Sequence, residues 1–208
     1  MVDWEGSGSH STTGIRNVPI AAVGSAGSGL TPTQGARIGQ PPASGAVASS
    51  IVRVLTVCSG NICRSPTAEA ALREALEEAG LDDRVEVDSA GTGSWHLGDP
   101  PDRRMVAAAA EAGLHVDGRA RRITEDDLED FDLVLTMDRS NHRDVRRLAG
   151  DDSRAEIRMF REFDPEADRP DAEVPDPYYG GKGVFDDVVT LTRRTAAKVV
   201  EHLRAELA

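Results

Sequence analysis

Cysteine and aromatic residues are scarce in this chain of 208 residues, which holds two cysteines and 4% aromatic residues. Two cysteines, Cys58 and Cys63, are too few for the disulfide framework that stabilises small secreted domains. The five histidines form no close pair, so the spacing of a metal-binding motif is missing as well. We therefore expect no structural disulfide, no bound metal and no cofactor.

Long apolar runs and a basic N-terminal segment are also missing. No apolar stretch approaches the ~20 residues that a helix needs to span a bilayer. The first residues are acidic where a secretory signal is basic, and no apolar segment follows them. We expect a cytoplasmic protein without a membrane segment, and export by an unconventional route stays open.

Positive charge is in deficit, because 24 lysines and arginines face 36 acidic residues and the net charge is −12. Residues 1–50 carry two acidic and two basic side chains, so the whole excess of negative charge belongs to residues 51–208. Such an acidic surface repels nucleic acid and anionic membranes, and we expect neither as a partner. An anionic substrate therefore requires a site that is locally positive.

The chain divides by composition near residue 50. Residues 1–50 are rich in Gly, Ser, Thr, Ala and Pro and show no apolar periodicity, which predicts a disordered tail. Residues 51–208 carry the apolar patterns of a folded domain.

Strands and helices are predicted to alternate within that domain. We expect strands over 51–57, 84–91, 132–138 and 155–160, and helices over 66–80, 102–113, 123–131, 139–150 and 185–208. This alternation predicts an α/β fold, a doubly wound parallel sheet of about four strands with helices on both faces. Sites in such sheets lie at the carboxyl ends of strands. In this chain we expect a phosphate-binding loop there, directly after the first strand.

That loop, CSGNICRS at 58–65, is a Cys-x5-Arg segment between a strand and a helix. Its backbone N–H groups and the helix N-terminus can cradle an oxyanion, and Arg64 offers a planar fork for two phosphate oxygens. The same positive surroundings favour the thiolate form of Cys58, which can attack a bound phosphorus atom. A buried inert cysteine beside a surface arginine is the alternative, which the strand–loop–helix setting disfavours.

Three further residues of the loop fit the same chemistry. Gly60 and Asn61 tolerate the positive φ angles that a tight cradle requires. Ser65 can donate a hydrogen bond to Cys58 and stabilise it as a leaving group.

A second segment, Asp176-Pro177-Tyr178-Tyr179-Gly180, can supply the acid that such a reaction needs. Asp176 can protonate a leaving oxygen and then, as a carboxylate, activate water. Tyr178 and Tyr179 can form the walls of a slot for an aromatic ring. Taken alone, the segment is more often an ordinary Asp-Pro turn with two half-buried tyrosines, because such turns are common.

Four segments in this order, CSGNICRSPTAEA, DSAGTGSWHLGDPPDRR, LTMDRSN and DPYYGG, resemble the low-molecular-weight protein tyrosine phosphatases over residues 51 to about 205. The resemblance implies hydrolysis of phosphotyrosine-containing proteins through a phosphocysteine, with inorganic phosphate as product. It makes Cys58 the nucleophile, Arg64 the phosphate clamp and Asp176 the general acid and base. The residues expected to bind substrate are Ser59, Gly60, Asn61, Ile62, Cys63, Ser65, Trp95, Tyr178 and Tyr179.

The resemblance also implies that Asn61 and Ser89 hold the shape of the loop. The family usually places a histidine just before the Arg-Ala-Arg segment, where it helps to brace the loop asparagine. Gly118 stands at that position here, so we expect the usual brace to be altered.

Three alternatives remain beside phosphotyrosine hydrolysis. Arsenate reductases share the fold and the loop but need further downstream cysteines, and none follows Cys63 in this sequence. Arginine phosphatases resemble this chain but carry Thr at the position of Ile62, whose apolar side chain suits a phenyl ring. A module that only binds phosphate would need neither Cys58 nor Asp176.

Cys63 has two interpretations, because it lies five residues after Cys58 in the same loop. It is either a small packing residue or the partner that captures oxidised Cys58 in a regulatory disulfide. The sequence leaves this choice open, together with the physiological substrate and the oligomeric state.

Overall fold

The computed structural model describes residues 51–151 and 153–208. Its strands are β1 (Val52–Cys58), β2 (Val85–Gly91), β3 (Leu133–Thr136) and β4 (Glu156–Met159). Its helices are α1 (Arg64–Ala79), α2 (Arg103–Glu111), α3 (Asp127–Asp130), α4 (Arg139–Ala149) and α5 (Lys182–Glu206), and η1 (Phe160–Phe163) is a single 3₁₀ turn. The predicted order of strands and helices is confirmed.

The four strands form one parallel sheet with the order β2-β1-β3-β4. β1 is an interior strand, and its apolar run fits that position because residues 54–58 are buried. It pairs with β2 from Val52–Val85 to Cys58–Gly91. The predicted doubly wound parallel sheet is therefore correct, and its interior strand β1 ends at Cys58.

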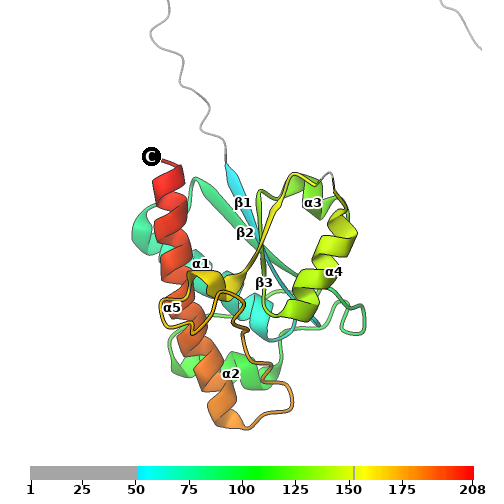
Figure 1. Ribbon diagram of the computed structural model, residues 1–208. Coiled ribbons are helices and arrows are strands. Elements are labelled where there is room, and N and C mark those ends of the chain that lie inside the picture. Colours follow the sequence, from blue (N-terminus) through cyan, green and yellow to red (C-terminus); the bar gives the residue numbers. More distant parts are fainter. Residues whose placement is uncertain (1–50, 152) are drawn as a thin grey trace, which may run out of the picture. The chain divides into compact units, whose positions relative to one another are not determined.

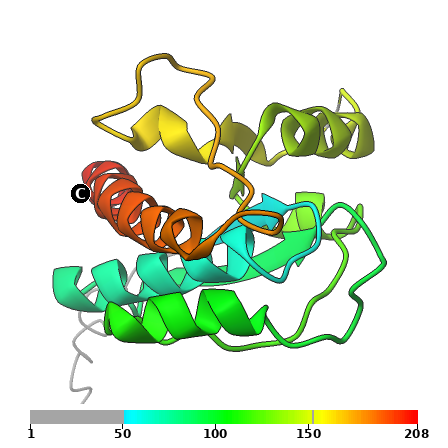
Figure 2. The same ribbon diagram turned by 90° about the horizontal axis from the view of Figure 1, so that it is seen from below.

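Helices cover both faces of the sheet, as predicted. α1, α2 and α5 lie together on one side, and α3 and α4 lie on the other (Figure 1). The view from below separates the same two layers (Figure 2). The larger core cluster joins α1, α2 and α5 through side chains such as Leu72, Met105 and Phe185, and the smaller one includes Val134 and Val145.

The ends of several elements differ from the prediction. α1 begins at Arg64, two residues before the predicted start, because the cradle loop runs directly into the first helical turn. The helix predicted over 123–131 forms only as the single turn α3. Thr124 and Asp127 form a reciprocal cap at its start, since Thr124 N–H donates to Asp127 Oδ2 at 2.7 Å and Asp127 N–H donates to Thr124 Oγ1 at 3.3 Å.

The predicted disordered tail, residues 1–50, lies outside the described residues. Within residues 51–151 and 153–208, no helix combines the length and the apolar character that crossing a membrane requires.

Candidate active site

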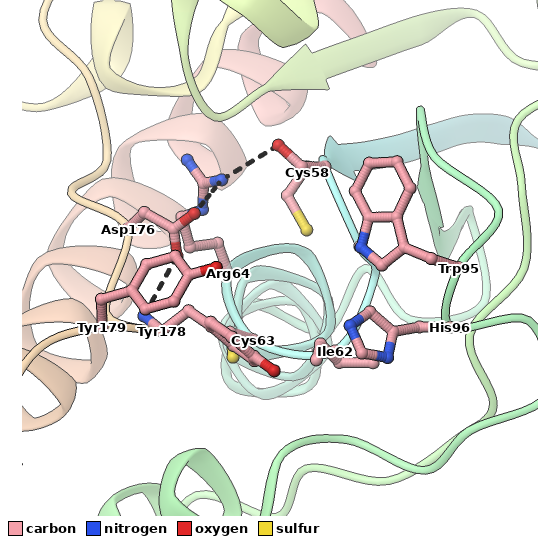
Figure 3. Close-up of a pocket in the computed structure, with 11 residues that line it drawn as sticks. Cys58, Ile62, Cys63, Arg64, Trp95, His96, Asp176, Tyr178 and Tyr179 are labelled. Carbon is pink, nitrogen blue, oxygen red and sulfur yellow. Dashed lines mark hydrogen bonds and ion pairs between the residues drawn. The ribbon is translucent and has the colours of Figure 1, made fainter.

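The site begins where β1 ends, because the interior strand delivers Cys58 to the carboxyl edge of the sheet. Cys58 is buried, and the loop after it turns into α1 within five residues. Figure 3 shows its sulfur pointing into a pocket between Asp176 on one side and Trp95 on the other. The pocket has a volume of about 260 Å³.

Two hydrogen bonds reach the sulfur of Cys58. The backbone N–H of Asn61 donates to it at 3.2 Å, and the hydroxyl of Ser65 donates to it at 3.1 Å. Donors aimed at sulfur stabilise a thiolate more than a thiol. The expected contact from Ser65 to Cys58 is therefore present in the structure.

Asn61 holds the loop in its shape. Its φ of 54° makes it the one residue other than glycine with a positive φ within the described ranges. Its side-chain amide donates to Ser65 Oγ at 3.0 Å and to Ser89 Oγ at 2.9 Å. Its side-chain oxygen accepts the backbone N–H of Arg121 at 2.9 Å. Three hydrogen bonds from three separate segments therefore fix the side chain of Asn61.

The histidine that the resemblance leads one to expect beside Asn61 has no counterpart. Gly118 stands there with a φ of 105°, a conformation that favours glycine, and it is exposed. The side-chain oxygen of Asn61 accepts the backbone N–H of Arg121. Both the nitrogen and the oxygen of the Asn61 side chain are therefore hydrogen-bonded in this structure.

Gly60 does not take the positive φ that the sequence suggested. A Cβ atom at Gly60 would lie 3.1 Å from His96 Cδ2, a tight contact that a small shift of the histidine side chain would relieve, and 3.7 Å from Trp95 Nε1, an ordinary contact distance. The loop backbone therefore passes close beneath the side chains of the 91–99 segment.

Arg64 is buried, with 3% of its surface exposed, and both ends of its guanidinium are engaged. Nη1 donates to Asp138 Oδ2 at 2.7 Å, and Nη2 donates to Asp176 Oδ2 at 3.1 Å and to Ser59 Oγ at 3.3 Å. Burial by itself lowers the pKa of an arginine, but the negative charges of Cys58, Asp176 and Asp138 raise the pKa of Arg64. The side chain is a fixed positive charge at the base of the pocket.

The aromatic side chains stand at the rim. Trp95 is 67% exposed and Tyr179 is 95% exposed, while Tyr178 is half-buried. The two tyrosine rings meet edge to face with centroids 4.9 Å apart. In Figure 3 the tyrosines lie on the side of Asp176, and Trp95 and His96 lie opposite them. The rim offers apolar walls to a flat ring.

The structure brings the sequence-derived candidates together. The pocket is lined by Cys58, Ser59, Gly60, Ile62, Cys63, Arg64, Trp95, His96, Asp176, Tyr178 and Tyr179. Asn61, Ser65 and Ser89 lie just behind it and hold the loop. Both cysteines are free and buried.

Three residues of the site escaped the sequence analysis. Asp138 binds Arg64 and also caps α4 by accepting the Asn141 N–H at 2.7 Å. The available signal was an Asp between a buried strand and a helix. His96 lines the pocket and is hydrogen-bonded to Asp99 at 3.0 Å. Gly91 had no local signal, because only the folded chain shows that a Cβ there would lie 2.8 Å from the Ser59 carbonyl oxygen.

No group of three or more His, Cys, Asp or Glu side chains able to hold a metal ion occurs in the part of the chain that the structure describes. What the site does hold is a thiol with two donors, a buried guanidinium, a carboxyl group and an apolar rim. These features define the class of proteins that bind a phosphate group over a cysteine in a strand–loop–helix cradle.

Comparisons with known proteins identify the family within that class. The profile of the family described as low molecular weight phosphotyrosine protein phosphatase matches residues 53–208. A low molecular weight protein-tyrosine-phosphatase of Streptomyces coelicolor is 40% identical over 156 residues, which are 74% of this chain and 95% of that protein. The chain belongs to the low molecular weight phosphotyrosine protein phosphatase family, a family of hydrolases.

Solved structures agree on the fold. The crystal structure of YfkJ from Bacillus subtilis superposes with a TM-score of 0.70 at 36% identity, covering 76% of this chain and 98% of that one. The structure of an arginine phosphatase from Drosophila has a TM-score of 0.67 at 30% identity, covering 73% of this chain and 97% of that one. The fold is thus shared by proteins named for different substrates.

Proposed function

We propose that this protein hydrolyses phosphotyrosine in proteins through a phosphocysteine intermediate on Cys58, without a metal ion. The observation that carries the proposal is the arrangement around one sulfur atom. Cys58 Sγ accepts hydrogen bonds from Asn61 N–H and Ser65 Oγ, and it shares its pocket with the Arg64 guanidinium and the Asp176 carboxyl group.

In the first step, the loop N–H groups and Arg64 hold the phosphate of the substrate over Cys58. The thiolate attacks phosphorus, so a sulfur–phosphorus bond forms as the bond from phosphorus to the phenolic oxygen breaks. Asp176 gives its proton to that oxygen. Because phosphate engages the guanidinium, it replaces the Asp176 carboxyl group as the partner of Arg64 Nη2.

In the second step, a water molecule attacks the phosphocysteine. Asp176, now a carboxylate, takes the proton of the water, and the sulfur–phosphorus bond breaks to release inorganic phosphate. The leaving thiolate is stabilised by the donors that face it, Ser65 Oγ and Asn61 N–H. The same two hydrogen bonds thus serve the nucleophile and the leaving group.

The rim supports an aryl substrate. Ile62 is buried in the pocket wall and presents apolar surface, and Trp95, Tyr178 and Tyr179 supply aromatic surface. A phenyl ring bound in this slot gains the burial of apolar area on several sides. A guanidinium substrate gains no polar partner from Ile62, which is the observation that favours phosphotyrosine over phosphoarginine.

Hydrolysis of p-nitrophenyl phosphate, measured with and without EDTA, tests the proposal. We expect turnover that EDTA leaves unchanged. Cys58→Ser is expected to abolish turnover while phosphate still binds, because the cradle and Arg64 remain. Activity of Cys58→Ser within tenfold of the wild type would refute the phosphocysteine. A parallel assay with a phosphoarginine peptide decides between the two substrate classes, and faster release of phosphate from that peptide would favour arginine phosphatase activity.

A further inference from the structure

The start of α2 lies against the cradle loop. Asp102, the N-cap of α2, donates its backbone N–H to the carbonyl oxygen of Ile62 at 2.7 Å. Its carboxylate accepts Arg104 Nε at 3.0 Å and Arg104 Nη2 at 2.7 Å. This pairing lowers the pKa of Asp102, chiefly through the side-chain hydrogen bond from Arg104. The orientation of the Arg104 guanidinium is therefore set by a residue that is itself attached to the loop of Cys58.

The free end of that guanidinium reaches the loop that carries Asp176. Arg104 Nη1 donates to the carbonyl oxygen of Tyr178 at 3.0 Å. Its Cζ lies 5.4 Å from the centre of the Tyr178 ring and 4.8 Å from that of Phe185, a buried residue of α5. Tyr178 in turn donates its backbone N–H to Asp176 Oδ1 at 3.1 Å. A continuous chain of contacts therefore joins Ile62 to Asp176.

Few hydrogen bonds hold this loop in place. Among residues 51–151 and 153–208, the hydrogen bonds that tie the 175–180 segment to the rest of the chain come from two arginines, Arg64 to Asp176 and Arg104 to Tyr178. In the proposed mechanism a bound phosphate takes over Arg64. The bond from Arg104 to Tyr178 is then the one that remains while Asp176 must face the leaving oxygen.

We propose that Arg104 is a positioning residue, which holds Tyr178 and through it the Asp176 carboxyl group at the height of the leaving oxygen. This inference rests on the proposed role of Asp176. Arg104 itself is not among the residues that line the pocket, so it acts through Tyr178 and not on the substrate. Its side chain is 50% exposed, and ion pairs this exposed add little to global stability.

The test is a double-mutant cycle that combines Arg104→Ala with Asp176→Asn. Each variant is assayed with aryl phosphates whose leaving phenols differ in pKa, and kcat and KM are measured separately. Arg104→Ala is expected to lower kcat for phenyl phosphate roughly 10- to 100-fold, because small misplacements of a catalytic group cost this much. The loss is expected to shrink for more acidic leaving groups, which need less protonation. KM is expected to change little.

The same substitution in the Asp176→Asn background is the decisive arm. The Asp176→Asn protein lacks the carboxyl group that Arg104 is proposed to position. We therefore expect Arg104→Ala to lower kcat by less than about twofold in that background. Arg103→Ala removes the neighbouring exposed arginine and is the matched control, expected to behave as the wild type in every assay. If Arg104→Ala does not fold, Arg104→Met keeps an aliphatic stem between the two rings, removes the donors and is expected to show the same pattern.

Equal losses in the two backgrounds, a loss independent of the leaving group, or an effect on KM alone would each overturn the positioning role. Unchanged turnover in a folded Arg104→Ala protein would do the same and leave the proposed function intact. Absence of turnover in the wild type would instead overturn the proposed function, and this inference with it.

Discussion

Single residues set the chemistry of this site, and Asn61 shows how. A positive φ is costly for a side chain other than glycine, yet the three hydrogen bonds of its amide group offset that cost. The strained turn aims its own N–H at Cys58 Sγ. The position of a reactive sulfur thus depends on one amide whose partners come from three separate segments.

Arg64→Lys tests whether the guanidinium works by shape as well as by charge. A lysine keeps the positive charge but cannot make a planar contact with two oxygens, nor bond Asp138 and a phosphate at once. We expect kcat/KM for p-nitrophenyl phosphate to fall by roughly 10²–10³, the range for loss of one donor to a developing charge. Arg147→Lys, at an exposed arginine on α4, is the control. A lysine variant with most of the wild-type kcat/KM would contradict two-oxygen clamping.

Asp176→Asn tests the acid. We expect a rate loss of ~10²–10⁴ with phenyl phosphate, the range for general acid–base catalysis. The loss should diminish as the pKa of the leaving phenol falls, which a series of substituted phenyl phosphates measures. The exposed Asp171→Asn is the control. If the loss were the same for every leaving group, Asp176 would have another role.

Cys63 is buried, and burial together with the negative charge of Asp102 raises the pKa of its thiol to about 12. Figure 3 shows its sulfur apart from that of Cys58. A thiol with this pKa is protonated at neutral pH and attacks oxidised Cys58 slowly. As long as the pH is below that pKa, raising the pH by one unit increases the thiolate fraction of Cys63 about tenfold. Any protective disulfide should therefore form faster at higher pH.

Peroxide treatment tests the disulfide hypothesis. We expect dithiothreitol to restore more activity to the wild type than to Cys63→Ser, and the difference to grow between pH 7 and pH 9. Mass spectrometry should find the peptide that contains both cysteines lighter by two hydrogens. Equal recovery in both proteins, without that mass change, would leave Cys63 as a packing residue.

At the scale of elements, buried ion pairs lock neighbouring segments together. Asp164 follows η1 and accepts Arg194 Nε of α5 at 2.7 Å and Arg161 Nε at 2.9 Å. Burial by itself would raise its pKa, but hydrogen bonds from Arg194, the Glu166 N–H and Arg161 lower the pKa of Asp164 to about 2. The carboxylate is therefore stabilised in the folded state relative to the unfolded one.

The sign of the pH dependence follows from this lowered pKa. The contribution of Asp164 is fully present above the unfolded pKa of about 4 and is lost as pH falls through the folded value. Asp164→Asn should lower the free energy of unfolding at pH 7 by roughly 2 kcal/mol, and the difference from the wild type should shrink towards pH 2. Urea unfolding at both pH values measures it. Asp171→Asn, at a half-exposed pair, should change stability far less. A pH-independent difference would contradict the linkage.

At the scale of the whole molecule, the core, the sheet and the site all lie within residues 51–208, and the family match begins at residue 53. Deleting residues 1–50 should leave kcat unchanged and the melting temperature within about 2 °C, because their composition carries no core-forming pattern. Calorimetry and the p-nitrophenyl phosphate assay compare the two chains. A clear drop in either quantity would show that the segment packs on the domain.

The sequence alone predicted the order of strands and helices, the parallel sheet and the loop from Cys58 to Arg64. These features depend on local patterns, namely the apolar run of β1, the glycine that ends α1 and the spacing within CSGNICRS. The local segment around Asp176 suggested it as a candidate acid, and the family resemblance then paired it with the loop, although Asp176 lies 112 residues beyond Arg64.

Only the tertiary structure decided which side chains meet across the sheet edge. Gly91 must be glycine because a neighbouring strand brings the loop within 2.8 Å of its missing Cβ. Arg121 donates its backbone N–H to the side chain of Asn61, and Arg104 of α2 reaches Tyr178 in the loop before α5. Such contacts join residues far apart in the chain, and their partners are fixed by packing, which no local pattern of residue types records.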